Sequence, residues 1–131
     1  MALEVPKEKL IEMLVNKKLV DFLIKQSVVK KGDSICYGKL LGVSKEDLRV
    51  YFIKHGYPGL RIPRYQIRTE PSGNEGQTEW TLNDGLYQVW YSERNTSHYI
   101  FSTESREVFE AYWIDENLDT WEEVLNKEWV L

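Results

Sequence analysis

The side chains that most often carry chemistry are few in this sequence and lie far apart. Its two histidines, His55 and His98, and its one cysteine, Cys36, lack the short spacings at which zinc ligands occur. Lys39, three residues after Cys36, favours a reactive thiolate, but a lone cysteine is more often a buried side chain. The chain has no G-x-S-x-G elbow, phosphate-binding glycine loop or dinucleotide fingerprint. We therefore predict no metal, no cofactor and no nucleophilic catalytic site.

Carboxylates stand in adjacent pairs near the end of the chain, at Asp115-Glu116 and Glu122-Glu123. Acid–base catalysis needs two groups that reach the same reacting atoms. Adjacent residues of a helix do not face each other, so these pairs are typical of a solvated helix surface. The sequence thus predicts a protein that is not an enzyme.

The charges divide along the chain. Residues 1–69 carry 14 Lys and Arg against 7 Asp and Glu, a net charge of +7, whereas residues 70–131 carry 3 against 14, a net charge of −11. The basic half could contact nucleic acid, and the acidic half could dock on a basic protein. A third interpretation is that the two halves attract each other within one fold.

Composition limits the class of protein. Seventeen aromatic residues in 131 exclude a disordered chain. No apolar run of 18 residues is present, and the first ten residues lack the pattern of a signal peptide. A single cysteine fits a reducing compartment. We expect one cytoplasmic domain over residues 1–131 that does not enter a membrane, and its oligomeric state is left open.

Two helical segments are expected in a basic part, residues 1–56. Apolar residues recur at helical spacing from Pro6, and Gly32 is the expected stop. The stretch 34–42 fits either a short strand or a helical turn. Ser44 and Asp47 form a capping box for a second helix that should end near His55 and Gly56.

From residue 65 the pattern alternates with a period of two, which predicts an antiparallel meander of about four strands over residues 65–102. The expected strands are 65–70, 79–82, 86–93 and 98–102, with a hairpin turn at Asp84-Gly85. An acidic part, residues 103–131, should hold two helices, capped at Thr103 and at Asp119. The expected fold class is α+β, with the meander flanked by N-terminal and C-terminal helices.

Residues 34–68 offer a nucleic-acid interface as the alternative function. A short apolar helix, a turn at Gly42 and a capped second helix follow each other in the order of a helix-turn-helix motif, whose second helix enters the major groove. The cations that would then contact DNA are Lys45, Arg49, Lys54, Arg61, Arg64 and Arg68. An isoelectric point of about 5.3 disfavours this function.

The run from residue 85 to residue 118 suggests a different function. A strand ends in an aromatic residue followed by Glu-Arg (Tyr91, Glu93 and Arg94), a polar turn and a second strand ending in Phe101 follow, and an acidic-capped helix comes last. This pattern resembles small immunity proteins of bacterial polymorphic-toxin and contact-dependent inhibition systems. Many members place a glycine after Glu-Arg, where this chain has Asn95, which tolerates a left-handed backbone. The resemblance implies a cytoplasmic protein that binds and occludes a cognate toxin.

An acidic inhibitor would be attracted to a toxin whose cleft is basic. We expect Tyr91, Glu93 and Arg94 to fix the hairpin corner, and Trp121 to anchor the interface. The predicted partner-binding residues are Tyr91, Glu93, Arg94, Glu116, Asp119, Trp121, Glu122 and Glu123. The expected partner is a cognate toxin or another basic protein.

Overall fold

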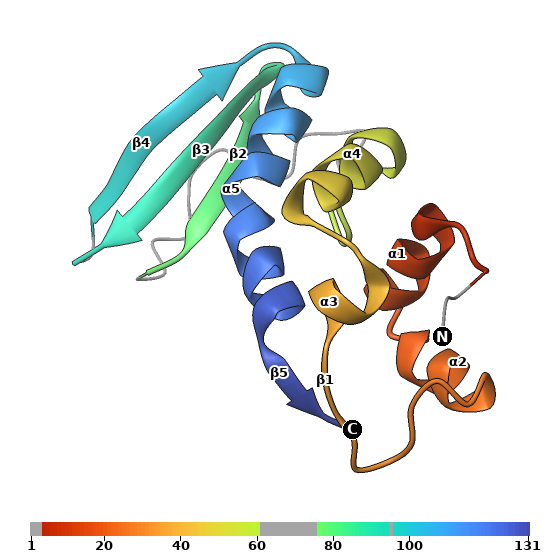
Figure 1. Ribbon diagram of the computed structural model, residues 1–131. Helices are drawn as coiled ribbons and strands as arrows, with labels where there is room; N and C mark the ends of the chain where they lie inside the picture. Colours follow the sequence, from red (N-terminus) through yellow and green to blue (C-terminus); the bar gives the residue numbers. More distant parts are fainter. Residues whose placement is uncertain (1–3, 61–75, 95) are drawn as a thin grey trace. The chain divides into compact units, whose positions relative to one another are not determined.

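The computed structural model describes residues 4–60, 76–94 and 96–131. Its elements are α1 (Lys7–Val15), α2 (Leu19–Lys25), β1 (Ser34–Cys36), α3 (Tyr37–Leu41), α4 (Lys45–His55), β2 (Thr78–Asn83), β3 (Leu86–Glu93), β4 (Thr96–Thr103), α5 (Arg106–Asn126) and β5 (Glu128–Val130) (Figure 1). The α+β prediction is confirmed. Internal contacts divide the chain into a helical unit, Met1–Pro58 with Ile114–Leu131, and a sheet unit, Gly59–Trp113.

The first expected helix is two helices, so the prediction of an unbroken helix to Gly32 was wrong. α1 ends where Lys17 adopts a φ of 60°, and the Lys18 N–H donates to the carbonyl of Met13 at 2.9 Å. Ser27, with a φ of 58°, ends α2 in the same way. Both ends have the form of a Schellman motif, in which glycine is the usual left-handed residue. Because lysine and serine stand at these positions instead of glycine, the sequence pattern did not predict either helix end.

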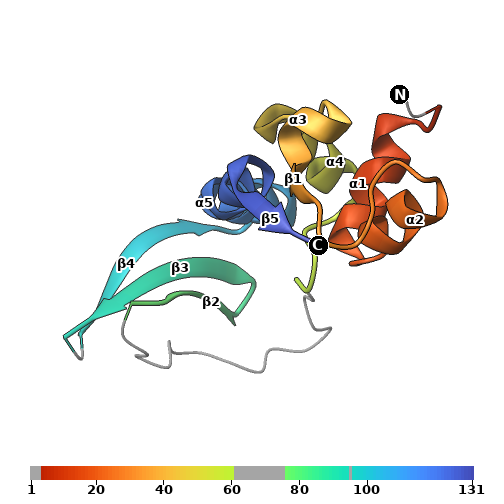
Figure 2. The same ribbon diagram turned by 60° about the horizontal axis from the view of Figure 1, so that its bottom comes forward.

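The stretch that fitted both a strand and a helical turn contains both. β1 pairs antiparallel with β5 of the same unit (Figure 2). In this pair Ile35 lies opposite Trp129. α3 follows at once and ends at Gly42, whose φ is 67°. The predicted capping box of α4 is confirmed, since the Asp47 N–H donates to Ser44 Oγ and the Asp47 carboxylate accepts from the Ser44 N–H.

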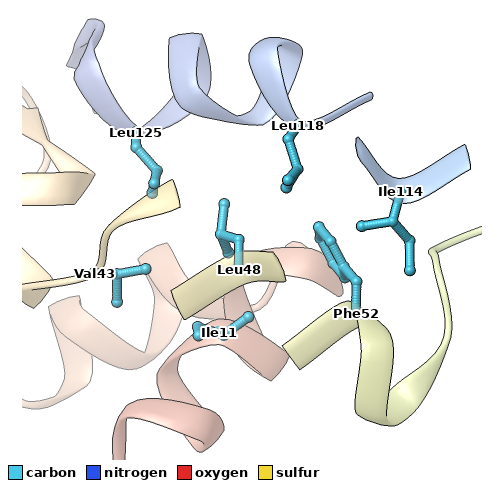
Figure 3. Close-up of a cluster of buried hydrophobic side chains, with 7 residues drawn as sticks. All are labelled: Ile11, Val43, Leu48, Phe52, Ile114, Leu118 and Leu125. Carbon is cyan, nitrogen blue, oxygen red and sulfur yellow. The ribbon is translucent and has the colours of Figure 1, made fainter. Parts of the chain in front are cut away.

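Helix α4 packs into the core of the helical unit. Leu48 and Phe52 are fully buried and lie against Ile114, Leu118 and Leu125 (Figure 3). A second cluster holds α1, α2 and β1 together through Leu10, Leu19, Leu23, Val29 and Ile35. Burial of Leu48 and Phe52 fixes which face of α4 points outward.

The sheet unit contains three antiparallel strands in the order β2-β3-β4. Asp84 and Gly85 join β2 to β3 with φ values of 50° and 78°, which confirms the predicted two-residue hairpin. Phe109, at the start of α5, is fully buried against Tyr87 and Val89 on one face of this sheet. The fourth expected strand, 65–70, lies outside the described residues.

One helix, α5, occupies most of the acidic part, so the prediction of two helices was wrong. Ser105, rather than Thr103, caps it, because Ser105 Oγ accepts from the Val108 N–H. No glycine or proline interrupts it near Asp119, and its apolar spacing continues through Leu118 and Leu125. The last residues of the expected second helix, Glu128–Val130, form the strand β5 instead.

Candidate functional site

The cations of α4 lie against carboxylates of α5. Lys45 Nζ is 2.6 Å from Asp119 Oδ1 and 4.0 Å from Glu122 Oε2. Arg49 Nε is 2.8 Å from Asp115 Oδ1. Hydrogen bonds to these carboxylates raise the pKa of the Lys45 ammonium and of the Arg49 guanidinium. The flanks of two packed helices therefore form a ladder of opposite charges within the helical unit.

The spacing of both sets of charges explains this ladder. Lys45 and Arg49 are four residues apart, so they lie on one side of α4. Asp115 and Asp119 share one side of α5 by the same rule. Once the buried side chains of the two helices meet, these sides are adjacent. Sequence reasoning missed the pairing because 66 and 74 residues separate the partners.

Lys54, the third cation of α4, pairs with α1. Its Nζ is 3.2 Å from Glu8 Oε1, and His55 Nε2 is 2.5 Å from the same oxygen. Hydrogen bonds from His55 and then Lys54 lower the pKa of Glu8. Each predicted DNA-contacting cation of α4 thus has a carboxylate beside it. The other three, Arg61, Arg64 and Arg68, lie outside the described residues.

The predicted partner-binding carboxylates fall into two groups. Asp119 and Glu122 face Lys45, as described above. Glu116 and Glu123 are exposed and form no ion pair with any residue that the structure describes. They lie about two residues out of phase with buried Leu118 and Leu125, which places them on the opposite, outward side of α5.

Trp121 is half-buried rather than displayed on that outward side. Its ring lies 5.4 Å from the Phe52 ring, and its indole N–H donates to the Tyr57 hydroxyl at 3.3 Å. Trp121 also lines an apolar cavity of about 380 Å³ with Tyr37 and Trp129. Its core contacts were not visible in the sequence, because Tyr57 follows the end of α4 and lies 64 residues away.

The remaining predicted residues belong to the sheet unit. Tyr91 and Glu93 lie at the end of β3, and Glu93 is opposite Thr96 across the turn to β4. Arg94 adopts a φ of 51°, in the left-handed region. Asn95 itself lies outside the described residues. Glu93 and Arg94 are exposed at this corner.

Cys36 is half-buried, and its thiol donates a hydrogen bond to the Leu125 carbonyl at 3.0 Å. This contact gives the cysteine a structural role between α3 and α5. Within residues 4–60, 76–94 and 96–131, no group of three or more His, Cys, Asp or Glu side chains could hold a metal ion. In the same residues, no helix is long and apolar enough to cross a membrane.

No protein-family model, no curated protein and no solved structure matches this chain.

Proposed function

We propose that this chain is a non-enzymatic binding protein that neutralises a partner protein with a basic surface, as an immunity protein that occludes a bacterial toxin. One observation carries the proposal: the cations of α4 are paired within the helical unit, whereas Glu116 and Glu123 on α5 are exposed without an ion pair among the described residues. The unpaired surface charge of this helix is therefore negative.

Exposed carboxylates on a rigid helix act mainly on the rate of association. A field of one sign attracts an oppositely charged protein before any contact forms, and added salt screens that attraction. Helix α5 is held by buried Ile114, Leu118 and Leu125, so Glu116 and Glu123 project from a fixed support. The surface is suited to a partner whose own active cleft is basic.

The same observation disfavours the nucleic-acid alternative. α3, Gly42 and α4 do follow each other as a short helix, a turn and a capped helix. A recognition helix, however, contributes cations to phosphates, and Lys45, Arg49 and Lys54 already lie within 2.6–3.2 Å of carboxylates. DNA would have to displace Asp119, Asp115 and Glu8 before it met these charges.

Growth rescue tests the proposal. If a neighbouring reading frame encodes a protein with a toxin-like C-terminal region, the chain would be co-expressed with that region, and the purified proteins would give the association rate. Wild type should restore growth, and Glu116→Lys/Glu123→Lys should slow association about tenfold at low salt, with the difference shrinking as salt is added.

The matched control is Glu4→Lys/Asp21→Lys, which changes the net charge equally at exposed carboxylates of other segments. Because this control leaves α5 unchanged, its association rate should stay closer to that of wild type. Equal association rates for both double variants would contradict the proposed role of Glu116 and Glu123 in attracting the partner. Failure to rescue growth with every variant, wild type included, would contradict the immunity function itself.

A band-shift titration with duplex DNA at two salt concentrations distinguishes the protein-binding function from the nucleic-acid-binding alternative. We expect no tight complex. Tight binding that weakens steeply with salt would favour the nucleic-acid alternative instead.

A further inference from the structure

The outer edge of β4 pairs with no other strand among the described residues. β4 is the last strand in the order β2-β3-β4 (Figure 1). Its eight residues, TSHYIFST, contain no proline, lysine, arginine or carboxylate. Proline and charged side chains are among the features with which natural proteins keep an edge from pairing with another chain; a β-bulge is another, and β4 has one at Ile100. Tyr99 and Ile100 at its middle are 54% and 42% exposed.

The sequence of this strand is nearly symmetric about its centre. Read from both ends, it gives threonine with threonine, serine with serine, the ring of His98 with the ring of Phe101, and Tyr99 with Ile100. An antiparallel pair of two copies with Thr96 opposite Thr103 would place each of these side chains beside its counterpart. Hydroxyl pairs and ring pairs across strands are favourable, and no like charges would meet.

A two-fold pair of strands also requires opposed side chains to share one face of the sheet, and the irregularity in β4 provides this. Register with β3 passes from Val89–Phe101 to Trp90–Tyr99, so Ile100 is an extra residue. Without it, Ser97 and Ser102 would lie on opposite faces, because their separation is odd. With it, they share one face.

Side-chain contacts agree with this assignment of faces. Ser97 Oγ lies 2.9 Å from Ser92 Oγ, and the Tyr99 hydroxyl donates to Ser102 Oγ at 2.6 Å. On the other face, the Phe101 ring stacks on Tyr112 of α5 with centroids 4.1 Å apart. Ser97, Tyr99 and Ser102 therefore face away from the helix, and Phe101 faces it.

We propose that β4 pairs antiparallel with β4 of a second copy of this chain, in the register that sets Thr96 opposite Thr103, so that two three-stranded sheets become one across a two-fold axis. This isologous contact involves neither Glu116 nor Glu123 of α5. An edge contact buries less surface than the roughly 800 Å² per partner of a standard interface, so the dimer should form in the micromolar to millimolar range.

Sedimentation equilibrium of the full chain over that range tests the pairing. The average mass should rise from 15.5 kDa toward twice that value as concentration increases. Ile100→Lys brings two cations together near the axis and should raise the dimer dissociation constant at least tenfold. The matched control, Val50→Lys, changes an exposed apolar residue of α4 (58% exposed) and should dimerise like wild type. A chain that stays monomeric throughout overturns the proposal, as does equal dimerisation of the two variants.

Disulfide capture tests the register without changing charge. In a Cys36→Ser background, Thr96→Cys/Thr103→Cys should form a covalently linked dimer on mild oxidation, because opposed residues of antiparallel strands lie within disulfide reach. Thr96→Cys or Thr103→Cys alone should cross-link at least tenfold more slowly, since each would face a threonine. Equal rates for the double and single variants would overturn the register.

Discussion

The two units of this protein use different means to bring their residues together. The sheet unit is built from neighbours in sequence, through a two-residue hairpin at Asp84-Gly85 and rings stacked between β3, β4 and the start of α5. The helical unit joins the two ends of the chain, and the ion pairs between its helices span 40 to 77 residues. Local rules therefore describe the first unit well and the second unit poorly.

Charge shows the same difference. The sequence halves carry +7 and −11, but the helical unit as folded has 12 Lys and Arg against 13 Asp and Glu, a net charge of −1. The sheet unit has 5 against 8, a net charge of −3. The attraction considered between the two halves is thus realised on the flanks of α4 and α5, and the polarity along the chain is not a polarity of the helical unit.

The largest expected effect separates the two cores. Phe52→Ala in the helical unit and Phe109→Ala in the sheet unit each remove a fully buried ring and should cost about 3–5 kcal/mol of unfolding free energy. Residue-level hydrogen exchange should show Phe52→Ala lowering protection in α4 more than in β3, and Phe109→Ala doing the reverse. Equal losses everywhere would show that both units unfold as one cooperative domain.

A smaller effect is expected where α3 approaches α5. A Cβ at Gly38 would lie 3.0 Å from the Leu125 backbone carbonyl, which the helix holds in place. Gly38→Ala should therefore destabilise the protein by about 1–3 kcal/mol, although alanine is the better helix former. Denaturant unfolding measures this, with exposed Lys39→Ala as the neighbouring control. A stabilised Gly38→Ala variant would contradict the close approach.

The two hairpin turns of the sheet unit should respond in opposite directions. Gly85 has a φ of 78°, so Gly85→Ala should cost about 1 kcal/mol. Arg94 has a φ of 51°, so Arg94→Gly should relieve strain and stabilise the unit by up to about 1 kcal/mol. Thermal unfolding measures both, and Arg94→Ala, which keeps the strain, should show no such gain. If Arg94→Ala stabilised the unit as much as Arg94→Gly, loss of the arginine charge, and not relief of backbone strain, would explain the gain.

Acid should weaken the helical unit. Hydrogen bonds from the Ser44 N–H and from Lys7 lower the pKa of Asp47, and those from His55 and Lys54 lower the pKa of Glu8. A lowered folded-state pKa contributes stability above the unfolded values of about 3.9 and 4.3, and that stability is lost as pH falls through the folded values. Denaturant unfolding at a series of pH values should show this loss, and Asp47→Asn/Glu8→Gln should flatten it. If the dependence of unfolding free energy on pH were unchanged in this variant, Asp47 and Glu8 would not be the cause of the loss of stability in acid.

The smallest effect concerns the charge ladder itself. The Lys45–Asp119 and Arg49–Asp115 pairs are largely exposed, so each should stabilise the fold only slightly. A double-mutant cycle with Lys45→Met and Asp119→Asn should give a weak favourable coupling at low salt that disappears at high salt. Coupling that is independent of salt would indicate a packing contact instead of an ion pair.

Periodicity and turn chemistry were enough to predict the α+β class, the capping box at Ser44, the hairpin at Asp84-Gly85 and the position of Glu93 and Arg94 at a corner. They failed at Lys17 and Ser27, where residues other than glycine end helices, and near Asp119, where an acidic cap pattern lies inside one long helix. The candidate site was predicted only in part. The sequence placed the carboxylates on a helix, but not which of them face another helix.

The sequence by itself determined the features that depend on a few adjacent residues, since backbone preference and alternation of apolar side chains act over one turn or one strand. Only the tertiary structure decided that Asp119 and Glu122 face Lys45 while Glu116 and Glu123 face outward. That division depends on which side of α5 is buried against Leu48 and Phe52, and burial is set by partners far away in the chain.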